Sequence, residues 1–348
     1  MNFILCKYRN KINQSLILLA ALIVAAPLVS CGLFAEPGYI TYAFGEEGSR
    51  DIAVSRPDGS DRRIITSDLA GQNADDFAPV WSPTSQYIAF ISNRDGNNEI
   101  YIAVSDGSNF MRITHTGVDE SQISWSPDGN RIAYTSESNE GHPQVNWLDL
   151  TNLRPNRLLF GSDSEADPSW SPSGDLIAFS VLDDNGNSSG IFLRNPDGVN
   201  RIQLSQSNDR NPAWSPDAKH LAFVSTRDGS EDIYVVEIGE NGPQGQAVRI
   251  TEAPGRDFAP IWSANGARIA FLSDRNGNID IFTVSPNGKN LKTLTRSPVD
   301  ITSIDWSNDD RLVFESINSG ASHLFVIAAD GVQKQITEGS TPSTLPDW

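Results

Sequence analysis

Short apolar runs separated by turn residues make up most of the chain between residues 39 and 348. Runs such as 100–102 (Ile-Tyr-Ile) and 233–235 (Ile-Tyr-Val) are rich in β-branched and aromatic residues, which favour half-buried pleated strands. Turn signals such as Ser-Pro-Asp-Gly at 126–129 lie between the runs, because Pro presets φ and Gly accepts a strained backbone. This part of the chain shows no amphipathic helix, so the pattern predicts an all-β fold.

Tryptophan gives the period of this pattern. Seven of the eight tryptophans recur at steps of 42 to 48 residues, and each interval holds three turn signals and four short strands. The repeating residues are Trp81, Trp125, Trp170, Trp214, Trp262, Trp306 and Trp348. A period in the forties with four strands per unit is typical of β-propeller blades.

The two ends of the repeat region predict how the ring closes. Residues 39–66 align without a gap with residues 87–114, so the first unit has its second, third and fourth strands but no Trp strand. The sequence given ends on Trp348, in a Trp strand without its partners. The two fragments make one blade, and a closed ring leaves no free sheet edge. We therefore expect a seven-bladed β-propeller of four-stranded blades over residues 39–348, closed by a blade shared between the two ends.

The repeat resembles the TolB-type propeller family. Its pattern, P-x-W-S-P-D-G-x-x-I-A-F-x-S-x-R-D-G, is matched by the units from Trp81, Trp125, Trp170 and Trp214 and more loosely by the others. In that family a partner protein docks at the mouth of the central channel, so the resemblance implies a binding role. Family members typically have six blades, and TolB carries a separate N-terminal domain, so seven units indicate a relative of TolB's propeller rather than TolB.

The first 38 residues predict an export signal and a lipid anchor. Residues 1–30 carry Lys7, Arg9 and Lys11, no acid, and an apolar run over 16–29, as in a secretory signal. The stretch 28–32 (Leu-Val-Ser-Cys-Gly) resembles a bacterial lipobox, which implies lipidation of Cys31; the alternative is an ordinary cleavage site with an incidental cysteine. Residues 31–38 would then be a short tether of roughly 25 Å. We expect an extracytoplasmic, membrane-anchored protein, at the outer membrane or periplasm of a two-membrane cell, or at the surface of a one-membrane cell.

Charge narrows the class of partner. The chain has a formal net charge of −18, and the three basic residues of 1–30 leave −21 on the rest. This balance argues against nucleic acid, whose phosphates need Lys and Arg, and favours a basic or neutral partner. The alternative meaning of the excess acid is solubility.

Acids recur before the repeated tryptophan. Five units carry one five residues ahead of it, and equivalent positions in a ring would converge at one mouth of the channel. The predicted mouth residues are Asp76, Glu120, Glu165, Asp209 and Asp257, together with the apolar Phe77 and Phe258. Clustered carboxylates raise one another's pKa values or recruit a hard cation such as Ca²⁺. The alternative is that each acid accepts backbone N–H bonds within its own loop.

These observations leave three hypotheses for function. The leading one is a monomeric, non-catalytic propeller that binds an envelope protein or peptide at the acidic mouth, without a cofactor other than a possible Ca²⁺. The second is an enzyme that uses mouth carboxylates on glycans or peptides. The third is a structural spacer in an envelope complex.

Overall fold

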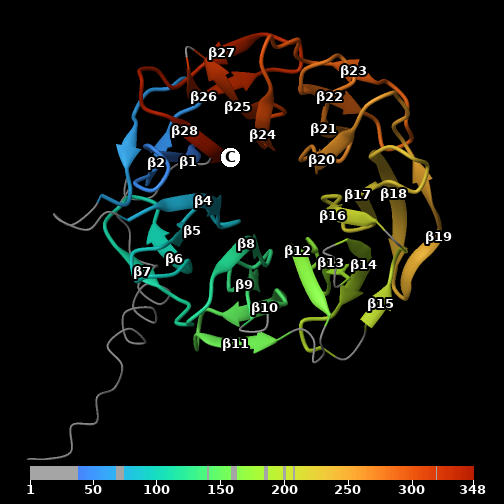
Figure 1. The fold of residues 1–348 in the computed structure, drawn as a ribbon, viewed down its shortest axis with the longest axis horizontal. Coiled ribbons are helices and arrows are strands. Elements are labelled where there is room, and N and C mark those ends of the chain that lie inside the picture. The colour runs from blue at the N-terminus through green and yellow to red at the C-terminus, as the bar shows by residue number, and fades with distance from the viewer. Residues whose placement is uncertain are drawn as a thin grey trace, which may run out of the picture.

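The structure is a computed structural model that describes residues 38–67, 74–138, 141–157, 163–183, 187–198, 201–206, 208–318 and 320–348. The predicted signal peptide, Cys31 and the tether up to residue 37 lie outside the described residues. All regular elements in the described parts are strands, arranged as seven four-stranded sheets around a central channel (Figure 1). The predicted all-β, seven-bladed propeller is confirmed.

Each blade is an antiparallel sheet whose inner strand leads to the repeated tryptophan. The inner strands are β4 (Asp76–Trp81), β8 (Glu120–Trp125), β12 (Ser164–Trp170), β16 (Asp209–Trp214), β20 (Asp257–Trp262), β24 (Ile301–Trp306) and β28 (Ser343–Asp347). The second strands are β1 (Ile40–Phe44), β5 (Tyr87–Ser92), β9 (Arg131–Ser136), β13 (Ile177–Leu182), β17 (His220–Ser225), β21 (Ile269–Ser273) and β25 (Leu312–Asn318).

The outer half of each blade is a third strand and a usually short fourth. The third strands are β2 (Asp51–Ser55), β6 (Glu99–Val104), β10 (Gln144–Asp149), β14 (Ser188–Arg194), β18 (Asp232–Gly239), β22 (Asp280–Val284) and β26 (Ala321–Ile327). The outer strands are β3 (Arg63–Ile64), β7 (Phe110–Arg112), β11 (Arg154–Arg157), β15 (Arg201–Gln203), β19 (Gly242–Arg249), β23 (Lys292–Thr293) and β27 (Gln333–Gln335).

The hydrophobic core lies between blades rather than inside any one of them. One cluster joins Ile100 and Ile102 of β6 to Trp125, Ile132 and Tyr134 of the next blade, and similar clusters link the other neighbours. A sheet can bury both of its faces only if it has a neighbour on each side. The ring therefore supplies each blade with the second partner that it needs.

The closing blade joins the two ends of the chain as predicted. Strand β28 pairs antiparallel with β1, and the two lie side by side although one is last and the other first in the sequence (Figure 1). Two carboxylates fasten it to its neighbours: Asp305 Oδ2 accepts the Trp348 N–H at 2.7 Å, and Asp347 Oδ2 accepts the Trp81 N–H at 2.7 Å. Burial, and for Asp305 the nearby Asp347 charge, raise both pKa values, that of Asp347 to about 6.

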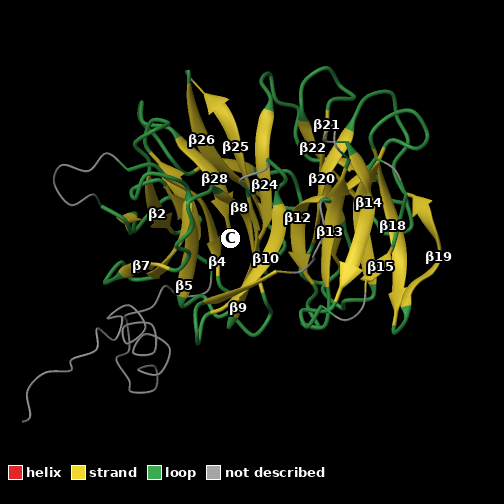
Figure 2. Ribbon diagram, turned by 60° about the horizontal axis from the view of Figure 1, so that its bottom comes forward, coloured by secondary structure: helices red, strands yellow, loops and turns green. Residues whose placement is uncertain are grey.

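The strands run between two loop-covered faces of the ring, seen obliquely in Figure 2. We call the face where the inner strands begin the front face, and the face where they end in the tryptophan the back face.

Six inner strands share an unusual backbone three residues before the tryptophan. The residue there has a positive φ of 48° to 54°, and a break in register with the second strand marks a β-bulge in each. These residues are Ala78, Gln122, Asp167, Asn211, Ala259 and Leu345. Left-handed backbone is costly for residues other than glycine, and a bulge re-aims the side chain beside it. The bulge therefore re-aims one side chain in each of six inner strands.

Removal of residues 343–348 is expected to destabilise the ring by more than the roughly 3–5 kcal/mol of one lost core tryptophan. The truncation removes β28, which exposes the edge of β1 and uncovers the faces of the neighbouring blades, and this should also cause self-association. Thermal melts and size-exclusion chromatography measure both effects, with Trp348→Phe as the control that keeps the strand. An unchanged, monomeric melt would contradict this account of closure.

Candidate functional site

The structure places the five predicted acids at the starts of inner strands, but inside the blades rather than on an open mouth. Their exposed fractions are at most 1%. They are Asp76, Glu120, Glu165, Asp209 and Asp257. Each is surrounded by groups from its own or the preceding blade, so the five do not form an accessible ring.

Three of these acids bind an arginine of their own blade. Asp76 Oδ2 accepts from Arg94 at 2.6 Å, and Asp209 and Asp257 accept from the equivalent Arg227 and Arg275 at 2.5 and 2.6 Å. The Nε of each arginine donates to a serine at the end of the second strand: Ser92, Ser225 and Ser273. Each guanidinium also lies over aromatic rings, as Arg275 does at 4.7 Å from Phe282. These units hold the hairpin between the second and third strands against the inner strand.

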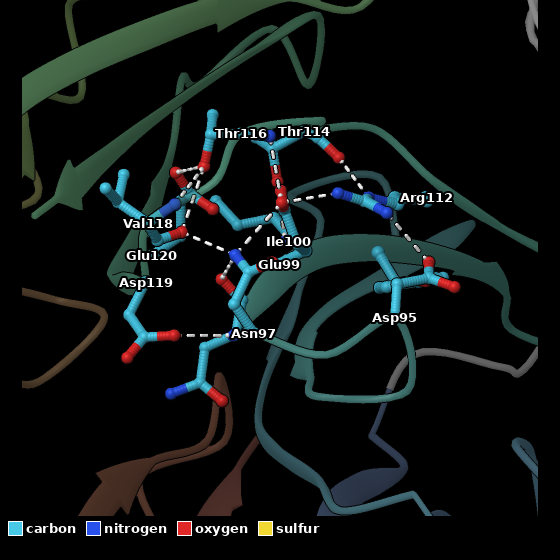
Figure 3. Close-up of polar contacts among 12 residues, drawn as sticks. Asp95, Asn97, Glu99, Ile100, Arg112, Thr114, Thr116, Val118, Asp119 and Glu120 are labelled. Carbon is cyan, nitrogen blue, oxygen red and sulfur yellow. Dashed lines mark hydrogen bonds and ion pairs between the residues drawn. The ribbon is translucent and has the colours of Figure 1, made fainter. Parts of the chain in front are cut away.

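Glu120 has no such arginine and instead faces Glu99 of the preceding blade (Figure 3). Its Oε1 accepts the hydroxyls of Thr116 at 2.8 Å and Ser136 at 2.9 Å. Glu99 Oε1 accepts from Arg112 and from the Thr116 N–H. Among the described residues, the second oxygen of each carboxyl is buried without a hydrogen-bond partner. Burial, reinforced by the Glu99 charge, raises the pKa of Glu120 to about 8, so this carboxyl is protonated at neutral pH.

Glu165 is bound to the backbone of the preceding blade. Its Oε2 accepts the Val145 N–H at 3.0 Å, and its own N–H donates to the Pro143 carbonyl at 2.8 Å. Together with the arginine units and the Glu120–Glu99 pair, this contact differs from both alternatives that the sequence left open, a ring at the channel mouth and backbone N–H bonds within each acid's own loop. The acids act within and between blades, because a buried carboxylate must find donors close by. Among the described residues, no group of three or more His, Cys, Asp or Glu side chains could hold a metal ion.

The two predicted phenylalanines lie at the front face, half-buried beneath arginines. Arg50 stands 4.8 Å from the Phe77 ring centre, and Arg256 stands 5.4 Å from that of Phe258. Arg50 is held by Asp75 at 2.6 Å, and Arg256 by Asp274 at 2.8 Å. Phe258 also lines the channel, so this part of the prediction falls on a surface that a ligand can reach.

The channel holds a cavity of about 880 Å³ between inner strands β8, β12, β16, β20 and β24. Part of its wall is polar: Gln122 Nε2 donates to Asp167 Oδ1 at 2.8 Å, and Gln122 Oε1 accepts the Asp167 N–H at 2.9 Å. Asp167 Oδ2 accepts from Ser180 at 3.0 Å and from the Asn211 N–H at 3.3 Å. Other parts of the wall are apolar, with Phe258, Ala259 and Ile261. Gln122, Asp167 and Asn211 occupy the left-handed bulge positions, which repeat three residues before the tryptophan and which sequence reasoning missed.

An ion pair completes the front rim of this cavity. Arg210 binds Glu231 of the same blade at 2.7 Å, and both side chains remain partly exposed. The rim therefore offers both charge signs beside Phe258, while the wall offers amide and carboxylate groups. Such a mixture suits a peptide, which presents N–H, C=O and side chains of several kinds.

The fold and this channel define a seven-bladed β-propeller with a peptide-sized central cavity. The family model described as the TolB beta propeller domain matches residues 12–211 and 206–348, so the chain belongs to that family. The TolB homolog of Chlorobium luteolum is 32% identical over 154 residues, which are 44% of this chain and 34% of that protein. The chain thus spans about a third of the length of this curated relative.

Solved structures share the fold at low sequence identity. TolB from Acinetobacter baumannii superposes with a TM-score of 0.60 at 20% identity, over 91% of this chain and 67% of that one. Oligogalacturonate lyase from Vibrio parahaemolyticus gives a TM-score of 0.64 at 12% identity, over 88% and 87% of the two chains. At these identities the likeness shows the fold alone.

Glu120→Gln is expected to change stability with pH in a way that identifies the buried pair. The folded pKa of about 8 lies above the ordinary 4.5, so the stabilising contribution is complete below 4.5 and is lost as pH rises towards 8. Gln imitates the protonated acid, so its melting temperature should match wild type at pH 4, exceed it increasingly between about pH 4.5 and 8, and differ by a nearly constant amount above that.

The exposed Glu137→Gln in the same blade is the control, and it should show no such trend. A difference between Glu120→Gln and wild type that stays constant from pH 5 to 9 would show that Glu120 is ionised throughout.

Proposed function

We propose that the protein is an extracytoplasmic, membrane-anchored β-propeller that binds a protein or peptide of the cell envelope at the front mouth of its channel, without catalysis. The observation that carries this proposal is the channel cavity, whose wall mixes the Gln122–Asp167–Asn211 arc with Phe258 and Ile261. Membership in the TolB propeller family supports a binding role.

The chemistry of the acids favours binding over turnover. A general acid or base must reach its substrate. Asp76, Asp209 and Asp257 are instead buried against arginines, and Glu120 is buried against Glu99. Among the described residues, Asp167 and Glu231 are the carboxylates that line the cavity. Asp167 is already engaged by Gln122, Ser180 and the Asn211 N–H, and Glu231 by Arg210. This arrangement holds the wall in place.

Net charge indicates the kind of partner. The formal charge of −18 repels acidic surfaces at long range, so we propose a basic or neutral segment as the occupant. The apolar part of the wall would receive its apolar side chains, and the amide groups of the arc would bond its backbone.

Asn211→Arg should abolish partner binding, because it places a long charged side chain in the cavity. Asn290→Arg is the matched control: Asn290 is exposed on the back face, with a φ of 58° close to the 52° of Asn211. A photo-crosslinking residue placed at 211 in intact cells should give a discrete adduct, and one at 290 should not. Equal adducts from both positions, or none from 211, would refute the channel as the site.

A turnover assay separates binding from catalysis. Wild type should leave peptide and oligosaccharide panels intact. If turnover is found and Asp167→Asn removes it while the protein stays folded, the protein is an enzyme and the non-catalytic proposal is wrong.

Cys31→Ala tests the anchor. Among the described residues, no helix is long and apolar enough to cross a membrane, and Cys31 lies outside them. We expect wild type to fractionate with membranes and the variant with the soluble extracytoplasmic fraction. Equal membrane retention of both would contradict lipidation at Cys31.

A further inference from the structure

The blade that begins at Glu120 lacks the arginine that other blades use to neutralise the inner-strand acid. In those blades the arginine stands eighteen residues after the acid, as Arg94 does after Asp76. The residue eighteen positions after Glu120 is Ser138, whose hydroxyl accepts the His142 N–H at 2.9 Å. Among the described residues, no cationic side chain of its own blade binds Glu120, so its charge must be balanced in another way.

The preceding blade adds further acid at this interface. Glu99 faces Glu120 and is bound by Arg112, but this guanidinium also binds Asp95 at 3.0 Å. Asp119, directly before Glu120, lies beside the pair (Figure 3). Acids therefore outnumber guanidinium groups in this part of the interface, and such an excess of negative charge attracts a cation.

Each carboxyl of the pair has one saturated oxygen and one open oxygen. The donors described above all reach the Oε1 atoms, as does Asn97 Nδ2 at 3.1 Å from Glu99. The Oε2 atoms of Glu99 and Glu120 are buried without a hydrogen-bond partner among the described residues, and both side chains are 0% exposed. The two carboxyls approach within hydrogen-bonding range of each other. Dry carboxylate oxygens in this position need a proton or a metal ion to compensate them.

The loop that leads into β8 supplies neutral oxygens at the same place. Thr116 Oγ1 lies 2.8 Å from Glu120 Oε1 and 2.9 Å from the Val118 carbonyl oxygen. Asn97 Nδ2 donates to that carbonyl at 2.6 Å, so a side-chain amide lies there too. Calcium accepts carboxylate, carbonyl and amide oxygens in irregular geometry, whereas magnesium requires near-octahedral ligands and dehydrates reluctantly. This mixed set of oxygens therefore suits calcium better than magnesium.

The same loop gives an ion a route to the pair. Gly117 and Asp119 are exposed at the front face, and Thr116 and Val118 are half-buried beneath them. A small movement of this surface loop is enough to admit an ion from solvent.

We propose that Glu99 and Glu120 bind a calcium ion between two blades, with the Thr116 hydroxyl and the Val118 carbonyl as further ligands. The ion bonds the open Oε2 atoms, and the proton that neutralises Glu120 in its absence leaves to solvent. It joins the two blades where an arginine is missing. A calcium ion expected from the sequence at the channel mouth would then lie between blades instead, independently of any partner in the channel.

Calorimetric titration of the EDTA-treated protein with CaCl₂ tests this site. The dissociation constant should be on the order of 0.1–1 mM, as in extracellular calcium modules, and magnesium should bind about tenfold more weakly. Calcium at about ten times its dissociation constant should also raise the melting temperature by a few degrees, because it binds the folded state. No binding of calcium, or equal binding of magnesium, would overturn the proposal.

Two variants and a control locate the ion. Glu120→Gln should abolish calcium binding because it removes a charged ligand at constant size, and Ser138→Arg should abolish it because it restores the arginine of the other blades. Glu137→Gln removes the same charge from an exposed position in this blade and should bind as wild type does. Melts in EDTA check that each variant is folded. Binding retained by Glu120→Gln or Ser138→Arg, or lost equally in Glu137→Gln, would show attraction to the acidic surface alone and refute the site.

Discussion

Ring closure is the constraint on which the rest of this structure depends. The core lies between blades, so a blade with one neighbour would leave half of its apolar surface in water. Pairing of β28 with β1 supplies the last neighbour, and the Asp305 and Asp347 carboxylates fasten that blade through the N–H groups of Trp348 and Trp81. The closed ring holds the inner strands in the positions that define the channel.

The acids of the repeat serve this architecture. A blade hairpin must be held against its inner strand, and the Asp–Arg–Ser unit does so with charge-assisted hydrogen bonds in a dry setting. Where the arginine is missing, Glu120 and Glu99 meet across a blade interface, and the pair is accommodated by a proton on Glu120. Several of the acidic side chains are therefore buried inside the blades. The electrostatic potential at the protein surface, which a partner would meet, comes from the exposed acids.

The two faces of the ring differ in what they present. At the front, bulged inner strands direct Gln122, Asp167 and Asn211 into a cavity beside Phe258. At the back, regular turns cover six blades. The lining of the channel cavity arises from the bulge in the repeated unit, whereas the second cavity lies beside the closing blade.

The sequence by itself determined the class of fold, the number of blades and the shared closing blade. Trp spacing, turn signals and strand composition are local, and they repeat often enough for errors in one unit to be corrected by the others. Only the tertiary structure decided where the side chains of Asp76, Glu120 and Asp257 point, because an acid at the start of an inner strand can face the channel or the inside of the blade. Arg94 and Arg275, eighteen residues later in the chain, turn two of these acids inward. Two further features could not be predicted from the sequence: the bulge that directs Asp167 to the channel and the cavity beside Asn308. Both depend on how neighbouring strands and turns pack.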